Sequence, residues 1–533
     1  MKLQRYIIFV KHGLRKKGVF ATKFIKKIIT FAGSFENGQS IFVNLNNITM
    51  NQELLNLYPK GLWDIFGHIC DAPHPSKHET AVVKWYKEWA KENNIPVVQD
   101  ETGNLLFTVP ATPGFENRTP VVLQAHCDMV PQADSDKAHD FLTDPIEPII
   151  DNGWVRANKT TLGADDGIGV AAALAAITDP NCQHGPIEVL VTIDEETGMT
   201  GAFGLKPGFV KGKILINLDS ETEGELYVGC AGGLDANFHR TYTTVATPAG
   251  MKGYKLFITG LHGGHSGMDI NLGRANANKI ATRFLQKVVR DFGGCVACIN
   301  GGGLRNAIPR EATAILTVPA AKAAEFEAFA KEFEAVVKKE FALTEEGLSL
   351  TVTAVDAPAQ VIEPKALCQF LNMIFAIPNG VQRMSDSMPG LVETSNNLAN
   401  FVAENGEMSA KCLLRSSVNS AKEALGEKMV AIAELAECGI ELTGAYPGWN
   451  PNMQSPIMNT CMKVYKEKYG NEPKVMAIHA GLECGLFGVC YPDWDMVSFG
   501  PTIEHPHSPV ERVNIESVGK FYDFLVEVLK NVK

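Results

Sequence analysis

The chain has 533 residues, of which 45% are hydrophobic and 20% charged, and its formal net charge is −11. This length exceeds what one hydrophobic core usually holds, so two or more domains are expected. The acidic balance argues against nucleic acid as a partner, and no run of about 18 apolar residues predicts a membrane span. The 12 scattered cysteines are typical of reduced thiols, so we expect a cytoplasmic protein.

The first 50 residues differ from the rest of the chain. They contain nine Lys or Arg residues but a single acidic residue, Glu36. A basic, acid-poor segment fits a transit peptide or an amphipathic segment at a membrane surface. We favour a third interpretation, a translated upstream leader with Met50 as the working start, because residues 50–70 resemble the first helix of a soluble protein.

Residues 54–94 carry apolar side chains every three or four positions, which predicts helices. Further along, short apolar runs bounded by turn residues alternate with a helical stretch. Strands are predicted at residues 104–112, 119–130, 185–196 and 212–221, and an Ala-rich helix at residues 167–177. This alternation predicts an α/β fold with a mostly parallel mixed sheet flanked by helices.

From about residue 232 the pattern changes to half-exposed antiparallel strands and long helices. Helices are predicted at residues 271–292 and 320–341, and strands at residues 306–319 and 347–357. A similar order of elements over residues 362–435 indicates an internal duplication, and the α/β pattern then returns. We therefore predict an α+β lid domain, residues 232–435, inserted into a catalytic domain made of residues 51–231 and 436–533.

Side chains that can bind metals follow several of the predicted strands. One strand ends in His126 and Asp128, the next in Glu195 and Glu196, and a third in Asp219. In open α/β sheets, ligand sites form beyond the carboxyl ends of the strands, so these groups are expected to converge. Each feature alone also fits a solvated turn, but their recurrence at several strand ends favours a metal site.

Two further segments extend this pattern. Asp165 and Asp166 precede the Ala-rich helix, where Asp can also act as an N-cap, and His505 and His507 follow a strand at residues 493–501. Carboxylate and imidazole ligands without cysteine favour a divalent transition metal over a structural zinc site. The number of ligands fits two ions roughly 3.5–4 Å apart that activate a water, with a further carboxylate as general base.

In chain order, the segments HCD, LGADDGIG, DEETG, NLDSE and HPHSPVERV resemble the M20 family of di-metal peptidases. Within that family, the chain is similar to the group of cytosolic non-specific dipeptidases, which includes aminoacyl-histidine dipeptidases. The resemblance covers residues 51–533 and implies the di-zinc peptidase fold and two divalent ions, zinc in the first place and manganese or cobalt as alternatives.

The same resemblance implies hydrolysis of dipeptides with free N-termini, Xaa-His among them, by water activated between the ions. An amidohydrolase that acts on N-acyl amino acids or tripeptides is the alternative activity, and a non-catalytic scaffold is the alternative class. Lids in this family often form homodimers, although a duplicated lid can fill the place of a partner within one chain.

The resemblance also implies a role for each matching residue. His126 and Asp219 would bind one ion, Glu196 and His507 would bind the other, and Asp165 would bridge the two.

Outside this ligand set, Glu195 would be the general base, and Asp128 would orient the imidazole of His126. His265, in the segment GLHGGHSGMD, would stabilise the oxyanion. Contacts to the substrate would come from Asn306, Arg415, His479 and Glu483. Asp194 matches no role of the family and is expected to be structural.

Overall fold

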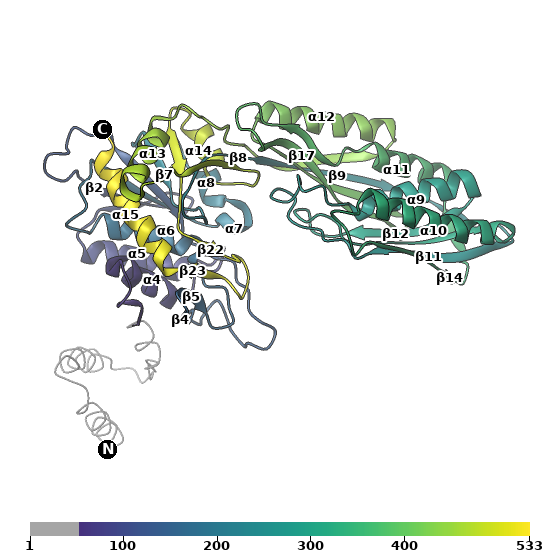
Figure 1. Cartoon of the computed structure of the whole chain (residues 1–533), viewed down its shortest axis with the longest axis horizontal. Helices are drawn as coiled ribbons and strands as arrows, with labels where there is room; N and C mark the ends of the chain where they lie inside the picture. The colour runs from purple at the N-terminus through teal and green to yellow at the C-terminus, as the bar shows by residue number, and fades with distance from the viewer. Residues whose placement is uncertain (1–52) are drawn as a thin grey trace, which may run out of the picture. The chain divides into compact units, whose positions relative to one another are not determined.

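The computed structural model of the protein describes residues 53–533, and the basic segment at residues 1–50 lies outside the described residues. The described residues form two large hydrophobic cores, and Figure 1 shows the helices and strands that surround them. One is built from residues 54–230 and 449–532, and the other from residues 234–436. We propose that the two cores correspond to the catalytic domain and the lid domain expected from the sequence.

The first core surrounds an eight-stranded mixed sheet with the strand order β1-β2-β6-β3-β7-β21-β8-β20. Its strands are β1 (Val97–Gln99), β2 (Leu105–Val109), β3 (Val121–His126), β6 (Ile187–Thr192), β7 (Ile214–Asn217), β8 (Glu225–Cys230), β20 (Lys474–Ile478) and β21 (Asp495–Ser498). The neighbours β6, β3, β7 and β21 run parallel, so their carboxyl ends lie along the same edge of the sheet. The α/β class predicted from the sequence is confirmed.

Helices pack around this sheet. They are α4 (Lys60–Asp71), α5 (Thr80–Glu92), α6 (Ala164–Ala176), α7 (Glu195–Gly198), α8 (Thr200–Gly204), α13 (Pro456–Tyr469), α14 (Cys484–Cys490) and α15 (Ile515–Asn531). All residues of α6 are buried, and its many alanines allow close packing against β3 and α4. Within residues 53–533, no helix combines the length and apolar character that a membrane span requires.

A smaller four-stranded sheet joins the C-terminal part of the chain to an earlier hairpin. Its strand order is β22-β23-β5-β4. The strands are β4 (Pro148–Asp151), β5 (Trp154–Ala157), β22 (Ile503–Glu504) and β23 (Arg512–Asn514). This sheet fixes the segment between β22 and β23, which contains His507, beside the segment that leads into α6.

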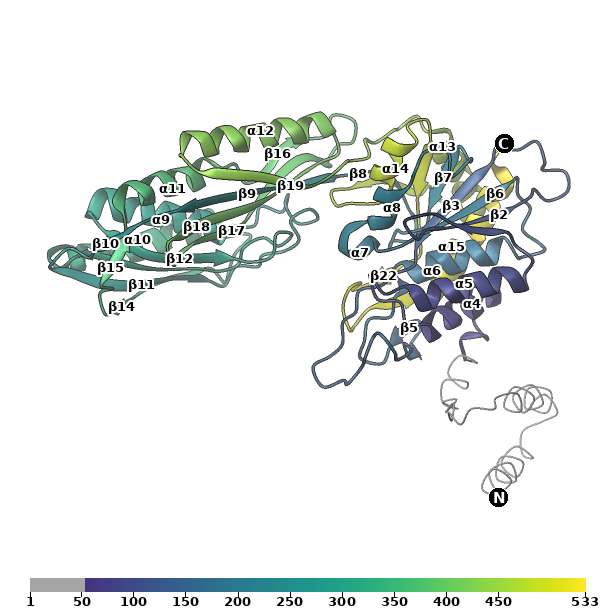
Figure 2. The same ribbon diagram turned by 180° about the vertical axis from the view of Figure 1, so that it is seen from behind.

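The second core lies between a nine-stranded sheet and four helices, which Figure 2 shows on one face of that sheet. The helices are α9 (Ala277–Phe292), α10 (Ala323–Glu340), α11 (Pro364–Ala376) and α12 (Asn419–Leu435). The strands are β9 (Gly232–Thr241), β11 (Met251–Thr259), β12 (Cys295–Gly302), β13 (Ala312–Pro319), β14 (Ser349–Val355), β16 (Gly380–Met384), β17 (Val392–Glu404), β18 (Glu407–Ser416) and β19 (Gly439–Tyr446). The short strands β10 (Thr244–Ala246) and β15 (Gln360–Ile362) form a separate pair.

The nine-stranded sheet contains two units with the same element order, βαββαβ, joined through β12 and β17. The first unit is continuous and runs from β11 to β14. In the second unit, the first strand is β9, which precedes the whole first unit in the chain. The duplication expected at residues 362–435 therefore also takes in β9 and β19, because the first unit is inserted after the first strand of the second.

Candidate active site

The parallel strands carry polar side chains to one edge of the eight-stranded sheet. β3 ends at His126, and β6 is followed by the single helical turn α7, which begins with Glu195 and Glu196. Asp219 lies two residues after β7, and His507 follows β21 and β22. This edge is where open α/β sheets form their ligand sites.

Asp165 lies between two imidazoles. Its Oδ1 is 3.2 Å from Nε2 of His126, and its Oδ2 is 3.0 Å from Nε2 of His507. Asp219 Oδ1 lies 3.7 Å from the same nitrogen of His126, and Glu196 Oε2 lies 2.9 Å from that of His507. One imidazole–carboxylate group is His126 with Asp219, and the other is His507 with Glu196. Both contact the carboxylate of Asp165, which is the arrangement that a pair of bridged ions requires.

The backbone before α6 aims the Asp165 side chain. Asp165 is the second residue of α6, but its φ of −83° and ψ of 106° are not helical. Gly163, two residues earlier, has a left-handed φ of 70°, and a Cβ added there would lie only 3.1 Å from the sulfur of Met129. A residue with a side chain would therefore be strained at position 163, in the loop that leads to Asp165.

Asp128 fixes both His126, through its backbone carbonyl, and the turn that follows β6, through its carboxylate. The Nδ1 of His126 lies 3.1 Å from the carbonyl oxygen of Asp128 and donates to it, which leaves the Nε2 lone pair for a ligand. Asp128 Oδ1 accepts the backbone N–H of Glu195 at 2.9 Å, and Oδ2 accepts that of Glu196 at 3.3 Å. The contact of Asp128 with this turn was not anticipated from the sequence.

Glu79 and Asp194 support the same turn. Glu79 Oε1 accepts the backbone N–H of Asp194 at 3.1 Å, and both carboxylates are buried. The Asp194 carboxylate in turn accepts hydrogen bonds from the hydroxyls of Thr197 and Thr200. Asp194 therefore stabilises the turn, whereas Glu79 is a supporting residue that the sequence analysis missed.

The electrostatics of the group fit a cation. Burial, and then the negative charge of Asp165, raise the pKa of Glu196 to about 7 and that of Asp219 to about 6. Burial lowers the pKa of His507, but its hydrogen bonds to Asp165 and Glu196 outweigh this effect and raise it to about 11. Glu196 Oε1 is buried without a hydrogen-bond partner among the described residues. Divalent cations would relieve the crowding of negative charge and supply that partner.

A second polar group joins residues of the nine-stranded sheet to His479, which follows β20 of the eight-stranded sheet. Arg415, on β18, is only 5% exposed. Its Nε donates to Ser266 Oγ at 3.3 Å, and its Nη1 donates to Tyr446 Oη at 3.2 Å. His479, which follows β20, lies with Nε2 2.7 Å from Ser395 Oγ. The side-chain partners of Arg415, Ser266 and Tyr446, are neutral hydroxyls, so its positive charge is available to an anionic ligand.

The tautomer of His265 is set by its own loop. Its Nδ1 accepts the backbone N–H groups of Gly267 at 3.3 Å and Met268 at 3.1 Å, so the proton resides on Nε2. Burial, and then the positive charge of Arg415, lower the pKa of His265 to about 4. His265 is therefore a neutral hydrogen-bond donor at Nε2.

Glu483 and Asn306, the two remaining residues predicted to contact the substrate, differ in their exposure and in their hydrogen bonds. Glu483 is fully buried, and its Oε2 accepts hydrogen bonds from Gln124 at 2.5 Å and Thr192 at 2.7 Å. Its Oε1 has no hydrogen-bond partner among the described residues. Asn306 is exposed, and its backbone carbonyl oxygen accepts the backbone N–H of Ser266 at 2.8 Å. This bond places Asn306 beside the loop that contains His265.

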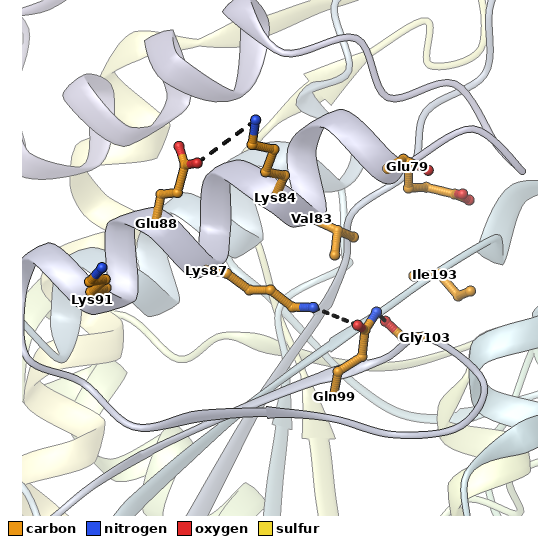
Figure 3. Close-up of a pocket in the computed structure, with 10 residues that line it drawn as sticks. Glu79, Val83, Lys84, Lys87, Glu88, Lys91, Gln99, Gly103 and Ile193 are labelled. Atoms are coloured by element: carbon orange, nitrogen blue, oxygen red, sulfur yellow. Dashed lines mark hydrogen bonds and ion pairs between the residues drawn. The ribbon is translucent and has the colours of Figure 1, made fainter.

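A pocket of about 600 Å³ lies along α5 (Figure 3). The figure shows Lys84, Lys87 and Lys91 on its helical wall, with Lys87 bonded to Gln99. None of the site residues predicted from the sequence lines this pocket. Glu79 and Ile193 connect the pocket to the turn that carries Glu195 and Glu196, Glu79 through its bond to Asp194 and Ile193 as the residue just before Asp194.

The chain is similar to known peptidases in sequence and in fold. The profile of peptidase family M20/M25/M40 matches residues 122–531. The cytosol non-specific dipeptidase of Escherichia coli (strain K12) is 46% identical over 480 residues, which cover 90% of this chain and 99% of that protein. The crystal structure of an aminoacylhistidine dipeptidase from Vibrio alginolyticus has 47% identity and a TM-score of 0.84, and the match covers 90% of this chain and 98% of that one. The chain therefore belongs to peptidase family M20/M25/M40.

Proposed function

We propose that the protein is a cytoplasmic metallopeptidase that hydrolyses dipeptides with free N-termini. The observation that carries this proposal is the position of Asp165 between two imidazole–carboxylate groups at the carboxyl edge of the sheet. The names of the E. coli and V. alginolyticus relatives support the substrate class, with Xaa-His dipeptides included, and the former supports the location. The homodimer remains a prediction.

Two divalent ions fit the ligand set. His126 and Asp219 would hold one ion, Glu196 and His507 would hold the other, and Asp165 would contact both. When bound, the ions would supply Lewis acidity and lower the pKa of a water molecule. We propose zinc, with manganese or cobalt as alternatives, because the ligands are imidazoles and carboxylates without a thiolate.

The remaining residues of the site would move protons and position the substrate. Glu195 would accept a proton from the attacking water and deliver it to the leaving amine. Asp128 would keep Glu195 in place through the hydrogen bond to its backbone N–H. His265, with its proton fixed on Nε2, would donate to the oxygen of the scissile carbonyl as negative charge develops there.

Two charged groups would select for short substrates. The buried guanidinium of Arg415 would bind the terminal carboxylate, with Asn306 and His479 beside it. The free Oε1 of Glu483 would accept a hydrogen bond from the α-amino group. Because a dipeptide carries both terminal charges on either side of a single peptide bond, an enzyme that binds both charges prefers dipeptides.

A substrate panel tests this proposal. Protein reconstituted with zinc is assayed with Xaa-His and other dipeptides, the matching tripeptides and N-acetyl amino acids. We expect the dipeptides to have the highest kcat/KM. N-acetylation of a dipeptide should lower kcat/KM roughly 10- to 100-fold, because it removes a charge-assisted hydrogen bond to Glu483.

The panel also separates the alternatives. If N-acetyl amino acids were hydrolysed as efficiently as dipeptides, the protein would be an amidohydrolase. If metal-loaded protein hydrolysed none of the substrates, the non-catalytic scaffold would be favoured.

A further inference from the structure

Glu511 is a buried acid that lies four residues after His507 and has no role in the site described above. Glu511 is only 2% exposed, and its side chain contacts the loop that leads into α6. Its two carboxylate oxygens accept four consecutive backbone N–H groups. Oε2 accepts from Leu162 at 2.7 Å and Gly163 at 3.2 Å, and Oε1 accepts from Ala164 at 2.8 Å and Asp165 at 3.4 Å.

This contact is more extensive than a helix cap. A capping side chain comes from the residue just before the helix and accepts from one or two N–H groups. Glu511 comes from a distant part of the chain and accepts from every residue of the loop 162–165. Negative charge at a helix start is also favoured by the helix dipole. The loop therefore depends on Glu511 for the partners of its buried N–H groups.

The segment of residues 507–512 is itself held in place. The backbone N–H of Glu511 donates to the carbonyl oxygen of Ser508 at 3.0 Å, and Arg512 opens β23, which pairs with β5. The same short segment thus contacts Asp165 twice. His507 contacts its carboxylate, and Glu511 contacts its backbone N–H.

We propose that Glu511 is a positioning residue of the metal centre, which sets the backbone of residues 162–165 so that the Asp165 carboxylate lies between His126 and His507. This inference rests on the proposed metal-binding function. It requires a carboxylate at position 511, because both oxygens accept hydrogen bonds. A glutamine would direct its NH₂ group at two N–H donors, which would push part of the loop away.

The test compares Glu511→Gln with a matched control, Glu188→Gln. Glu188 is also buried and accepts two backbone N–H groups, from Lys211 at 2.8 Å and Gly212 at 2.7 Å, but it lies on β6 near the end opposite the site. Zinc affinity is measured by chelator competition, and the visible spectrum of the cobalt-substituted protein reports on ligand geometry. Melting temperatures of the metal-free proteins measure general destabilisation.

We expect Glu511→Gln to weaken zinc binding roughly 10- to 100-fold, the range for residues that orient metal ligands, and to alter the cobalt spectrum. Glu188→Gln should leave zinc affinity and the cobalt spectrum those of the wild type, whatever its effect on the melting temperature. The proposal is overturned if Glu511→Gln behaves like this control.

A second variant covers the case in which Glu511→Gln does not fold. Glu511→Asp keeps the charge but is one methylene shorter, so it cannot reach all four N–H groups, and we expect weaker zinc binding. Wild-type affinity in this variant would equally overturn the proposal. Failure of the proposed function is seen separately, as metal-loaded wild-type protein that hydrolyses no dipeptide.

Discussion

Replacing Glu195 by Ala is expected to lower kcat for dipeptides at least ~100-fold, in the range of general-base catalysis, while the protein keeps its affinity for metal ions. The side chain belongs to neither of the imidazole–carboxylate groups, so its loss should leave the proposed ligands in place. Its neighbour Glu196 is a proposed metal ligand, with Oε2 2.9 Å from Nε2 of His507. Replacing Glu196 is therefore expected to weaken metal binding.

The surroundings of Glu195 explain why it would serve as a base. Burial raises the pKa of Glu195 well above its usual range, and the negative charges of Asp219 and Glu196 add to this effect. Positive charge at the centre would lower that pKa again and leave an ionised carboxylate. The backbone N–H of Glu195 is fixed by Asp128, so the base is held at one position.

Steady-state kinetics and metal content of the same preparations check this prediction. Glu195→Gln keeps the shape of the side chain but cannot accept the proton, and it should be as impaired as Glu195→Ala. Glu101→Gln, at an exposed acid paired with Lys206, is the control and should retain wild-type turnover. Near-normal turnover in Glu195→Ala, or loss of a metal ion from it, would show that the assignment is wrong.

Replacing Asp165 by Asn should weaken the binding of both ions, by more than the ~10- to 100-fold typical of residues that only orient ligands, and should abolish activity at ordinary metal concentrations. Asp165 contacts His126 through one oxygen and His507 through the other. An amide provides only one acceptor oxygen and no negative charge, so neither ion retains its full ligand set.

The control for this variant is Asp495→Asn. Asp495 also uses both oxygens, which accept hydrogen bonds from Ser455 Oγ and the backbone N–H of Ile457, at the start of α13. Calorimetric titration with zinc should show weakened binding at both sites in Asp165→Asn only. An Asp165→Asn protein that binds two ions with wild-type affinity would contradict the bridging role.

Much of the site could be predicted because several of its residues stand in the sequence at, or just after, the end of a strand that can itself be recognised. Buried strands such as β3 are mostly apolar, and the polar residues at their carboxyl ends or just after them are the groups that meet at the sheet edge. The turn after β6 differed from the expectation of an extended chain, since Glu195 and Glu196 begin a helical turn.

The supporting contacts could not be predicted, because they join residues that are distant in the chain. Glu79 accepts from Asp194, and Glu511 accepts from the loop before α6, yet neither acid stands in a pattern that marks a partner. The assignment of β9 to the second βαββαβ unit was hidden for the same reason. Strand pairing between β9 and β18 spans the inserted first unit and has no local signal.

The most direct test of the two-ion centre is dipeptide turnover by wild-type protein that has been depleted of metal with EDTA and then titrated with Zn²⁺, Mn²⁺ or Co²⁺. We expect negligible turnover in the depleted protein and an increase that ends when two ions are bound per chain. Full turnover by protein that contains no divalent ion would contradict the proposed mechanism.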